Sequence, residues 1–389
     1  MAKRWAQKID SLSESMTVAV SDRARELQQK GVKVVNLGGG DPDFDTPPHI
    51  VEAAVAAIHN GLTHYVASKG IPGLRKAVAA KFQRDNLVAY DPDTEVIVTA
   101  SGKLALYITL AALIEPGDEI LYIDPAWVSY EPMIRMLDGV PVDVPLHPED
   151  NFILDGDVLK SRISPRTKAM ILNSPNNPTG RVLTPEELNI VARSAQEHGF
   201  WVLSDEIYEH IIYDQRRHIS LASLPGMRGL TVTLNGMSKA YAMTGWRLGY
   251  LGAPAPLCEQ ILKVQQHVVT CAPSFVQAAG VAALQGPQGC VVEMTAEYDR
   301  RRRFMTDALN SIPGVHCPLP EGAFYLFPEV TFQGLGSNAL AEFMIEKAHV
   351  AVTPGSAFGH AGARNIRLTF ATSMANLRQA AEQMKTAME

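Results

Sequence analysis

The residues of this 389-residue chain that most directly suggest chemistry are a lysine and an arginine that share one loop. Lys239 follows the apolar run 230–234, and the small-residue segment after it ends at Arg247. A lysine desolvated at the end of a strand can lose its proton and attack a carbonyl to form a Schiff base. An arginine offers a planar fork to a phosphate. The pair suggests pyridoxal phosphate, although a solvated lysine and a surface arginine would give the same pattern.

A sheet is needed to position this loop. Apolar runs predict strands at 95–99, 119–123, 168–172, 200–204 and 230–234, and helical patterns separate them. One helix carries its own boundaries, with Thr184 as N-cap, Glu187 completing a capping box and Gly199 at the end. Buried strands alternating with helices predict an α/β fold with a mostly parallel central sheet sandwiched by helices. Ligands of such sheets bind beyond the carboxyl ends of the strands.

Several polar or aromatic residues follow these strands and are therefore expected at the same edge as Lys239. They are Ser101, Gly102 and Lys103 after the first strand, Trp127 after the second, Asn177 after the third and Asp205 at the end of the fourth. A carboxylate at the dry end of a strand needs a cationic partner, and a protonated pyridine nitrogen would serve. The alternative for Asp205 is a helix cap.

The other candidates each have a functional and a structural interpretation. Tyr208 and Asn177 could contact the ring hydroxyl, or Tyr208 could belong to the core. The Ser101-Gly102-Lys103 segment opens a helix, where free N–H groups favour a phosphate. Trp127 could stack on an aromatic ring or fill the core.

Residues outside the predicted sheet add three more candidates. Arg367 alternates with apolar neighbours on a strand and needs a carboxylate, which is either a protein side chain or the α-carboxylate of a substrate. The glycines that end at Gly40 permit close approach to a ligand or simply form a turn. Tyr65 is a candidate for an exposed loop or an interface. After residue 286, strands mixed with helices indicate a smaller α+β region, from 293–309 through 322–327, 337–348, 350–352 and 365–370 to a final helix.

Four motifs together resemble a known family. They are Gly-Asp-Pro-Asp-Phe-Asp-Thr-Pro at 40–47, Asn-Pro-Thr-Gly at 177–180, Ser-Asp-Glu-Ile-Tyr at 204–208 and Ser-Lys-Ala-Tyr-Ala-Met-Thr-Gly-Trp-Arg at 238–247. In order and spacing they resemble the class I/II aminotransferases among the fold-type I pyridoxal phosphate enzymes, and more narrowly the bacterial aspartate aminotransferase branch. The resemblance runs from about Thr17 to the final helix.

The resemblance implies a role for each candidate. Lys239 would form the Schiff base with pyridoxal 5′-phosphate and move the substrate proton, Asp205 would pair with the pyridine nitrogen, and Trp127 would stack on the ring. The resemblance further implies that Asn177 and Tyr208 contact the ring hydroxyl, that Ser101, Gly102, Lys103, Ser238 and Arg247 hold the phosphate with Tyr65 of a partner subunit, and that Gly40, Trp127, Asn177 and Arg367 bind the substrate.

The same resemblance implies a ping-pong transfer of an amino group from an L-amino acid to a 2-oxo acid. It implies a homodimer with sites at the subunit interface and three regions. These are an N-terminal segment at 1–49, a large cofactor-binding domain at 50–285 and a small C-terminal domain at 286–389. Two departures stand out: Gly236 replaces a serine found in many relatives, and no second cation for an acidic substrate is evident.

Composition restricts the remaining alternatives. The net charge of −6 comes without a basic stripe, so we expect no nucleic-acid partner. We expect a cytoplasmic enzyme without a membrane anchor, because the four cysteines are scattered and no apolar stretch near Met1 or elsewhere suits a signal or a span. The alternatives are a carbon–sulfur β-lyase on the same scaffold and a non-catalytic effector-binding module.

Overall fold

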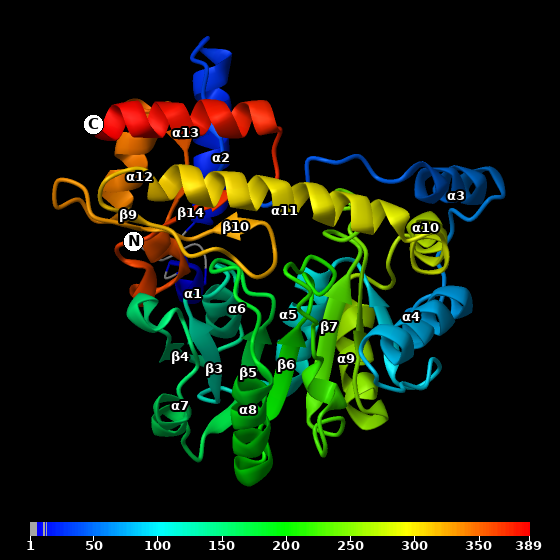
Figure 1. Cartoon of the computed structure of the whole chain (residues 1–389). Coiled ribbons are helices and arrows are strands. Elements are labelled where there is room, and N and C mark those ends of the chain that lie inside the picture. The colour runs from blue at the N-terminus through cyan, green and yellow to red at the C-terminus, as the bar shows by residue number, and fades with distance from the viewer. Residues whose placement is uncertain (1–5, 11, 13) are drawn as a thin grey trace.

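The computed structural model describes residues 6–10, 12 and 14–389, and the segment Met1–Trp5 lies outside this range. A seven-stranded sheet forms the lower half of the molecule in Figure 1, and a layer of helices with small sheets covers its upper edge. Within the described residues no helix has the length and apolar character that a membrane span requires.

The central sheet has the strand order β2-β8-β7-β6-β5-β3-β4, and only β8 runs antiparallel to its neighbours. This confirms the prediction of a mostly parallel sheet. In the same order the strands are Val96–Thr99, Gly249–Gly252, Thr231–Gly236, Trp201–Asp205, Thr167–Asn173, Glu119–Asp124 and Val140–Pro145. Strands β4 and β8 were not predicted from the sequence. Two prolines mask the strand pattern of β4, and β8 has only four residues, of which two are glycines.

Helices cover both faces of this sheet, as near-continuous burial of its strands requires. One face packs against α5 (Gly102–Leu113), α6 (Tyr130–Met136) and α9 (Ala255–Val268). The other face packs against α4 (Pro72–Asp85), α7 (Gly156–Arg162) and α8 (Pro185–His198). The predicted capping box of α8 is present: Glu187 N–H donates to Thr184 Oγ1, and Gly199 ends the helix at φ 73°.

The upper layer joins the two ends of the chain. β1 (Val35–Asn36) pairs in parallel with β12 (Val350–Ala351), so residues far apart in sequence share one small sheet. A second small sheet is β10 (Tyr325–Leu326), β14 (Ile366–Thr369) and β13 (Thr353–Pro354), and a third is β11 (Glu329–Val330) with β9 (Val315–His316). The strand predicted over 322–327 is therefore shortened to two residues.

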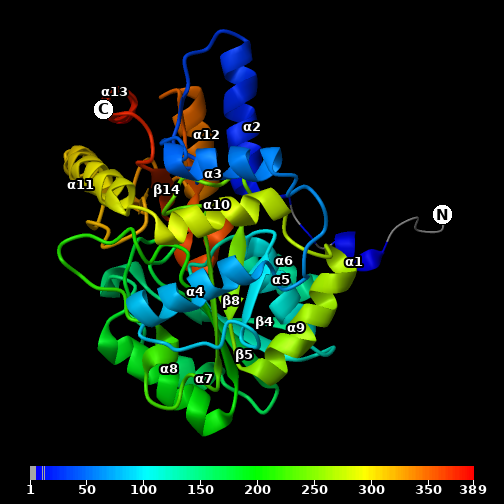
Figure 2. The same cartoon turned by 90° about the vertical axis from the view of Figure 1, so that its right-hand side faces the viewer.

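The helices of this layer surround those small sheets (Figures 1 and 2). They are α2 (Met16–Gln29), α11 (Gly289–Asn310), α12 (Ser337–Glu346) and α13 (Met374–Met388), whereas α1 (Gln7–Asp10) lies against α6. Figure 2 shows α3 (Pro48–His59) lying along α10 (Ser274–Gln285), and these two helices make extensive contacts.

Register brings the polar strand ends into line. Asn173 at the end of β5 is paired with Asp205 at the end of β6, and Asp205 is paired with Leu234 near the end of β7. Above them, Arg367 on β14 is paired with Thr353. The carboxyl edge of the large sheet therefore faces the small sheets of the upper layer.

Candidate active site

A cavity of about 400 Å³ lies at this carboxyl edge of the central sheet. Twelve of the thirteen predicted site residues line it, namely Gly40, Ser101, Gly102, Lys103, Trp127, Asn177, Asp205, Tyr208, Ser238, Lys239, Arg247 and Arg367. Tyr65 does not line it and is 85% exposed. The sheet edge thus collects residues from five strand ends and from β14 in one place.

Lys239 reaches into this cavity with an amine whose pKa is lowered. Its Nζ donates to Gly40 O and lies 5.9 Å from the Tyr208 ring centre and 5.6 Å from that of Phe324. Desolvation lowers the pKa of Lys239 to about 8, with Asp41 opposing that shift and Arg367 reinforcing it. A substantial fraction of the amine is therefore neutral near physiological pH and able to attack a carbonyl.

Asp205 faces the same cavity and is held by a residue that the sequence analysis missed. The Tyr130 hydroxyl donates to Asp205 Oδ2 at 2.7 Å, and the Ile207 N–H donates to Oδ1 at 3.3 Å. Burial raises the pKa of Asp205 to about 6, and both hydrogen bonds oppose that rise. No ion pair of Asp205 occurs within the described part of the chain, so the carboxylate is available to a cation in the cavity.

Cations and helix N–H groups define a different end of the cavity. Ser101, at φ 111°, caps α5 through a hydrogen bond from Leu104 N–H to its Oγ. Lys103 and Arg247 lie close enough that the charge of Arg247 adds to burial in lowering the pKa of Lys103. Arg247 Nη1 donates to Thr244 O at 2.7 Å, and buried Ser238 lies alongside. Two cations at a helix N-terminus form a site for a phosphate.

Arg367 is buried without an acidic partner. Its Nη1 donates to Asn177 Oδ1 at 3.1 Å, its Nη2 donates to Gly38 O at 2.6 Å, and its Nε has no hydrogen-bond partner. The guanidinium centre lies 4.4 Å from the Tyr325 ring centre. Among the residues that the structure describes, no carboxylate forms an ion pair with it. The sequence predicted either a protein carboxylate or a substrate carboxylate as the partner of Arg367, and no protein carboxylate takes that role among the described residues.

Several lining residues escaped the sequence analysis. Tyr130 follows Trp127 closely, Asn173 is the last residue of β5, and the Tyr325 hydroxyl lies 2.8 Å from that of Tyr208. Asn173 Nδ2 donates to Asp205 O at 2.9 Å and so ties β5 to β6. A polar residue at the end of a predicted parallel strand was the available signal for Asn173. Tyr130 and Tyr325 resemble core aromatics in sequence.

Gly236 is not among the lining residues of the cavity. A Cβ at this position would lie 3.0 Å from Leu248 O and 3.3 Å from Ile207 Cδ1. A serine there would therefore be directed at packed backbone and side-chain atoms. Ser238, by contrast, does line the cavity.

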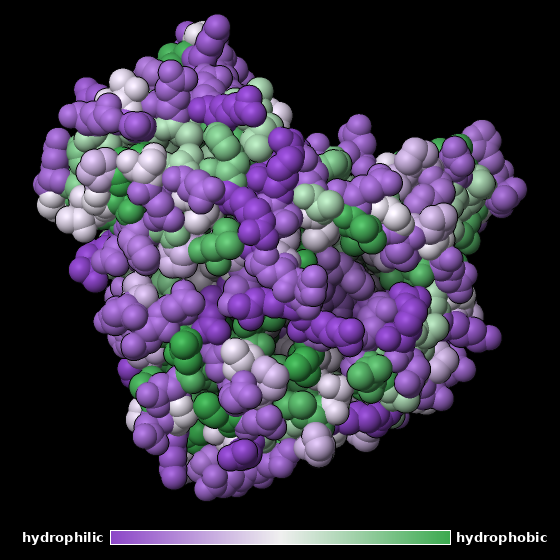
Figure 3. Space-filling view, in the orientation of Figure 1, coloured by the Kyte–Doolittle hydropathy of each residue, from purple (hydrophilic) through white to green (hydrophobic). Residues whose placement is uncertain are grey.

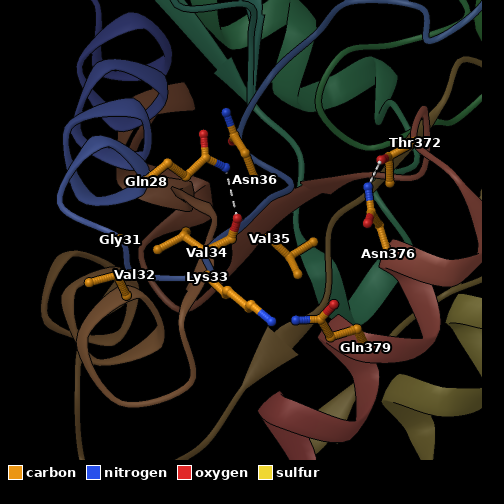
Figure 4. Close-up of a pocket in the computed structure, with 10 residues that line it drawn as sticks. All are labelled: Gln28, Gly31, Val32, Lys33, Val34, Val35, Asn36, Thr372, Asn376 and Gln379. Carbon is orange, nitrogen blue, oxygen red and sulfur yellow. Dashed lines mark hydrogen bonds between the residues drawn. The ribbon is translucent and has the colours of Figure 1, made fainter.

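A second pocket differs from this cavity in the charged residues that line it. It lies between the segment 28–36 and α13, has a volume of about 570 Å³ and includes Lys33 as its only charged residue (Figure 4). Two of its four side-chain amides are internally paired: Gln28 Nε2 donates to Val34 O and Asn376 Nδ2 to Thr372 Oγ1, each at 2.9 Å. Without an acid or a second cation, this larger pocket offers no comparable chemistry.

Comparison with known proteins agrees with this geometry. The family model "Aminotransferase class I and II" matches residues 32–384. An aspartate aminotransferase of Musicola paradisiaca is 45% identical over 95% of this chain and 92% of its own length. The aspartate aminotransferase from Thermus thermophilus with maleate superposes with a TM-score of 0.95 at 41% identity, covering 99% of this chain and 100% of that one. An aromatic aminotransferase from Pyrococcus horikoshii gives a TM-score of 0.89 at 44% identity, covering 94% and 98%.

The chain therefore belongs to the class I and II aminotransferases, which are fold-type I enzymes dependent on pyridoxal 5′-phosphate. The donor set of the cavity fits that cofactor. An amine with a lowered pKa suits the aldehyde, a carboxylate without an ion pair among the described residues suits the pyridine nitrogen, and the N-terminus of α5 together with Arg247 suits the phosphate.

Proposed function

We propose that this aminotransferase transfers the amino group of an acidic L-amino acid, aspartate in particular, to a 2-oxo acid. The observation that carries the proposal is the set of unpaired charges around one cavity: Lys239, Asp205 and Arg367. Charges that lack protein partners in a water-poor cleft are matched to a ligand that brings the opposite charges.

The proposed cofactor contacts follow from the position of each group. Lys239 Nζ would hold the aldehyde carbon, Asp205 the ring nitrogen, and Tyr208 with Asn177 the ring hydroxyl. Ser101, Gly102, Ser238 and Arg247 would hold the phosphate. When bound, pyridoxal phosphate supplies an electron-withdrawing ring that stabilises negative charge on the substrate Cα.

The protein's own residues determine which substrate bond reacts. Arg367 would bind the α-carboxylate through its donors and through the fixed amide of Asn177, which orients the Cα–H bond toward Lys239. The Lys239 amine, released and neutral, would then take the proton from Cα. A pKa near 8 suits both removal and return of that proton.

Lys103 is the residue that we propose for the side-chain carboxylate of aspartate. Its Nζ lies 4.7 Å from the Trp127 ring centre, and it forms no ion pair within the described part of the chain. The family resemblance implied a contact of Lys103 with the cofactor phosphate, and no cation was then evident for the side-chain carboxylate of an acidic substrate. Support for an acidic substrate comes from relatives named aspartate aminotransferase and from the Thermus enzyme with maleate, a dicarboxylate.

We further propose a homodimer in which Tyr65 reaches the cofactor phosphate of the partner subunit. Tyr65 is exposed in the single chain, and α3 leaves Val51, Val55 and Ile58 partly exposed on one side. Figure 3 shows hydrophobic residues at the α3 end of the molecule, and others are scattered over the rest of that face. We also propose a cytoplasmic location. We further propose the division into 1–49, 50–285 and 286–389, and the pairing of β1 with β12, which joins the two ends of the chain, supports this division.

A panel of amino donors and 2-oxo acids tests the proposed reaction. The purified enzyme, loaded with pyridoxal phosphate, is assayed with aspartate, glutamate, alanine and phenylalanine against 2-oxoglutarate, oxaloacetate and pyruvate. We expect the highest kcat/KM with aspartate and 2-oxoglutarate. Release of ammonia and pyruvate from cysteine-type substrates without an oxo-acid acceptor would instead identify a β-lyase.

A further inference from the structure

A buried network of charges lies directly behind the active-site turn. Residues 205–209 present Asp205 and Tyr208 to the cavity, whereas Glu206 and Glu209 are not among its lining residues. These two carboxylates are almost fully buried, with exposures of 0% and 7%. The same short turn therefore carries catalytic-site groups on one side and two buried acids on the other.

The two buried acids are bridged by groups from other elements. Lys81 of α4, itself 0% exposed, forms an ion pair with Glu209 and donates to Asn86 Oδ1 at 2.6 Å. Asn86 Nδ2 donates to Glu206 Oε2 at 2.8 Å and to Glu209 Oε2 at 2.7 Å. Asn86 thereby bridges the two carboxylates, and Lys81 supplies a positive charge to one of them.

The network continues to the strand that carries Lys239. Asn235, near the end of β7, donates from Nδ2 to Glu209 Oε1 at 2.6 Å and also lines the cavity. Its own Oδ1 accepts from the Gly236 N–H at 2.7 Å. Glu209 thus joins the Asp205 turn to the strand end from which the Lys239 loop departs.

With His218 protonated, the two cations and the two carboxylates of the network sum to zero without any ligand. Burial opposes that protonation, but Glu206 and Glu209 outweigh it and raise the pKa of His218. Glu206, Glu209 and His218 form a group of metal-ligand type, and their ligand atoms lie within 4.8 Å of one another. Lys81 already provides a cation there, and His218 Nε2 lies 2.9 Å from Glu206 Oε2. Ser204 and Ser220 donate to Glu206 Oε1 at 2.8 and 2.7 Å. The ammonium of Lys81 therefore occupies the role that a metal ion would have.

We propose that Lys81 is a positioning residue of the active site: by neutralising Glu209 behind the 205–209 turn, it fixes the place and the charge state of Asp205. Removing one partner of a buried ion pair leaves an uncompensated charge, which acts over several ångströms in a medium of low dielectric constant. Glu206 already raises the pKa of Asp205, although burial is the larger cause. The inference rests on the proposed cofactor role of Asp205.

Other titratable groups lie near Asp205 or near the Lys81–Glu209 pair, and none of them is mutated in the test. Asp205 is faced by Tyr130, Glu206, Tyr208 and Lys239. The Lys81–Glu209 pair is faced by Asp85, Glu206, His210, His218, Tyr241 and Tyr250. The variants below leave all of these in place, so a shift between variants reports the altered charge.

The experiment uses charge variants of opposite sign. Lys81→Met leaves excess negative charge, Glu209→Gln leaves excess positive charge, and the double variant restores neutrality. The dissociation constant of pyridoxal phosphate for each apo-protein is measured from pH 5 to pH 9 by the absorbance of the bound cofactor. We expect the acid break of that profile to move up by about one pH unit in Lys81→Met, down by a similar amount in Glu209→Gln, and back in the double variant.

A purely structural role gives a different pattern. It would weaken both single variants in the same direction and leave the pH break where it is in the wild type, and that result would overturn the inference. If Lys81→Met fails to fold, the comparison of Glu209→Gln with the double variant still decides. Wild-type protein that binds no cofactor would instead overturn the proposed function, and this inference with it.

Discussion

The two sides of the 205–209 turn hold similar charged residues, but those behind the turn are paired with other protein groups and those in the cavity are not. Behind the turn, each oxygen of Glu206 and Glu209 has a protein partner, and Lys81 has Glu209 and Asn86. In the cavity, Asp205 and Arg367 lack ion-pair partners among the described residues, and Arg367 Nε has no hydrogen bond. The fully paired residues behind the turn, which we call the closed network, contribute to one stable geometry. The cavity residues without ion-pair partners, which we call the open side, are completed by a ligand.

This difference also explains where sequence reasoning succeeded. Open residues at the ends of the parallel strands could be predicted, because parallel strands end at one edge and polar residues there have little structural reason to be present. Lys239, Asp205 and Asn177 were found in this way, and the capped helix α8 was predicted from Thr184 and Glu187.

The closed network could not be predicted in the same way. Lys81 lies within a helix that contains other basic residues, and nothing in its local sequence distinguishes it from a solvated lysine. Its partner Glu209 is 128 positions away, and the contact depends on how α4 packs on the sheet. Strand β8 was missed for a related reason, since it is a short glycine-bounded segment that pairs only in the assembled sheet.

The strongest test of the open side is Lys239→Met. This change removes the amine while retaining most of the side-chain volume, so we expect the covalent attachment of the cofactor to be lost and kcat to fall by at least about 10³-fold. Absorbance of the bound cofactor and the transamination rate measure the two effects. Lys263→Met, at a lysine on α9 that does not line the cavity, is the matched control. Retention of normal absorbance in Lys239→Met would contradict the assignment.

A smaller loss is expected from Arg367→Lys, which keeps the charge but removes the fork. Lysine cannot bind a carboxylate through two parallel hydrogen bonds, so we expect KM for the amino acid to rise by about 10²-fold. Cofactor affinity should change little, because Arg367 is proposed to contact substrate. Separate measurement of KM and of the cofactor dissociation constant checks this. An unchanged KM with weaker cofactor binding would move Arg367 from the substrate to the cofactor.

Lys103→Ala tests the proposed contact with the side-chain carboxylate by comparing two substrates. If Lys103 binds the side-chain carboxylate, we expect KM for aspartate to rise by about tenfold and KM for alanine to stay the same, since an exposed charge pair with a substrate contributes about 1 kcal/mol. The ratio of kcat/KM values for the two donors is the measurement. A weaker affinity for pyridoxal phosphate with an unchanged ratio would return Lys103 to the phosphate, where the sequence analysis placed it.

Tyr130→Phe tests whether one hydrogen bond separates the two sides of the turn, and its effect should be the smallest and the most dependent on pH. The Tyr130 hydroxyl stabilises the charged form of Asp205, so its loss should raise the pKa of Asp205 above about 6. A carboxylic acid with a raised pKa is neutral over a wider range of low pH. Cofactor affinity should therefore fall several-fold near pH 6 and stay close to the wild-type value at pH 8, where Asp205 is ionised in both proteins. The dissociation constant of pyridoxal phosphate, measured across this range, checks the prediction.

Tyr122→Phe, at a partly buried tyrosine of β3 away from the cavity, should leave the profile unchanged. A loss of affinity of equal size at both pH values would mean that Tyr130 acts by packing and leaves the charge of Asp205 to the network behind it.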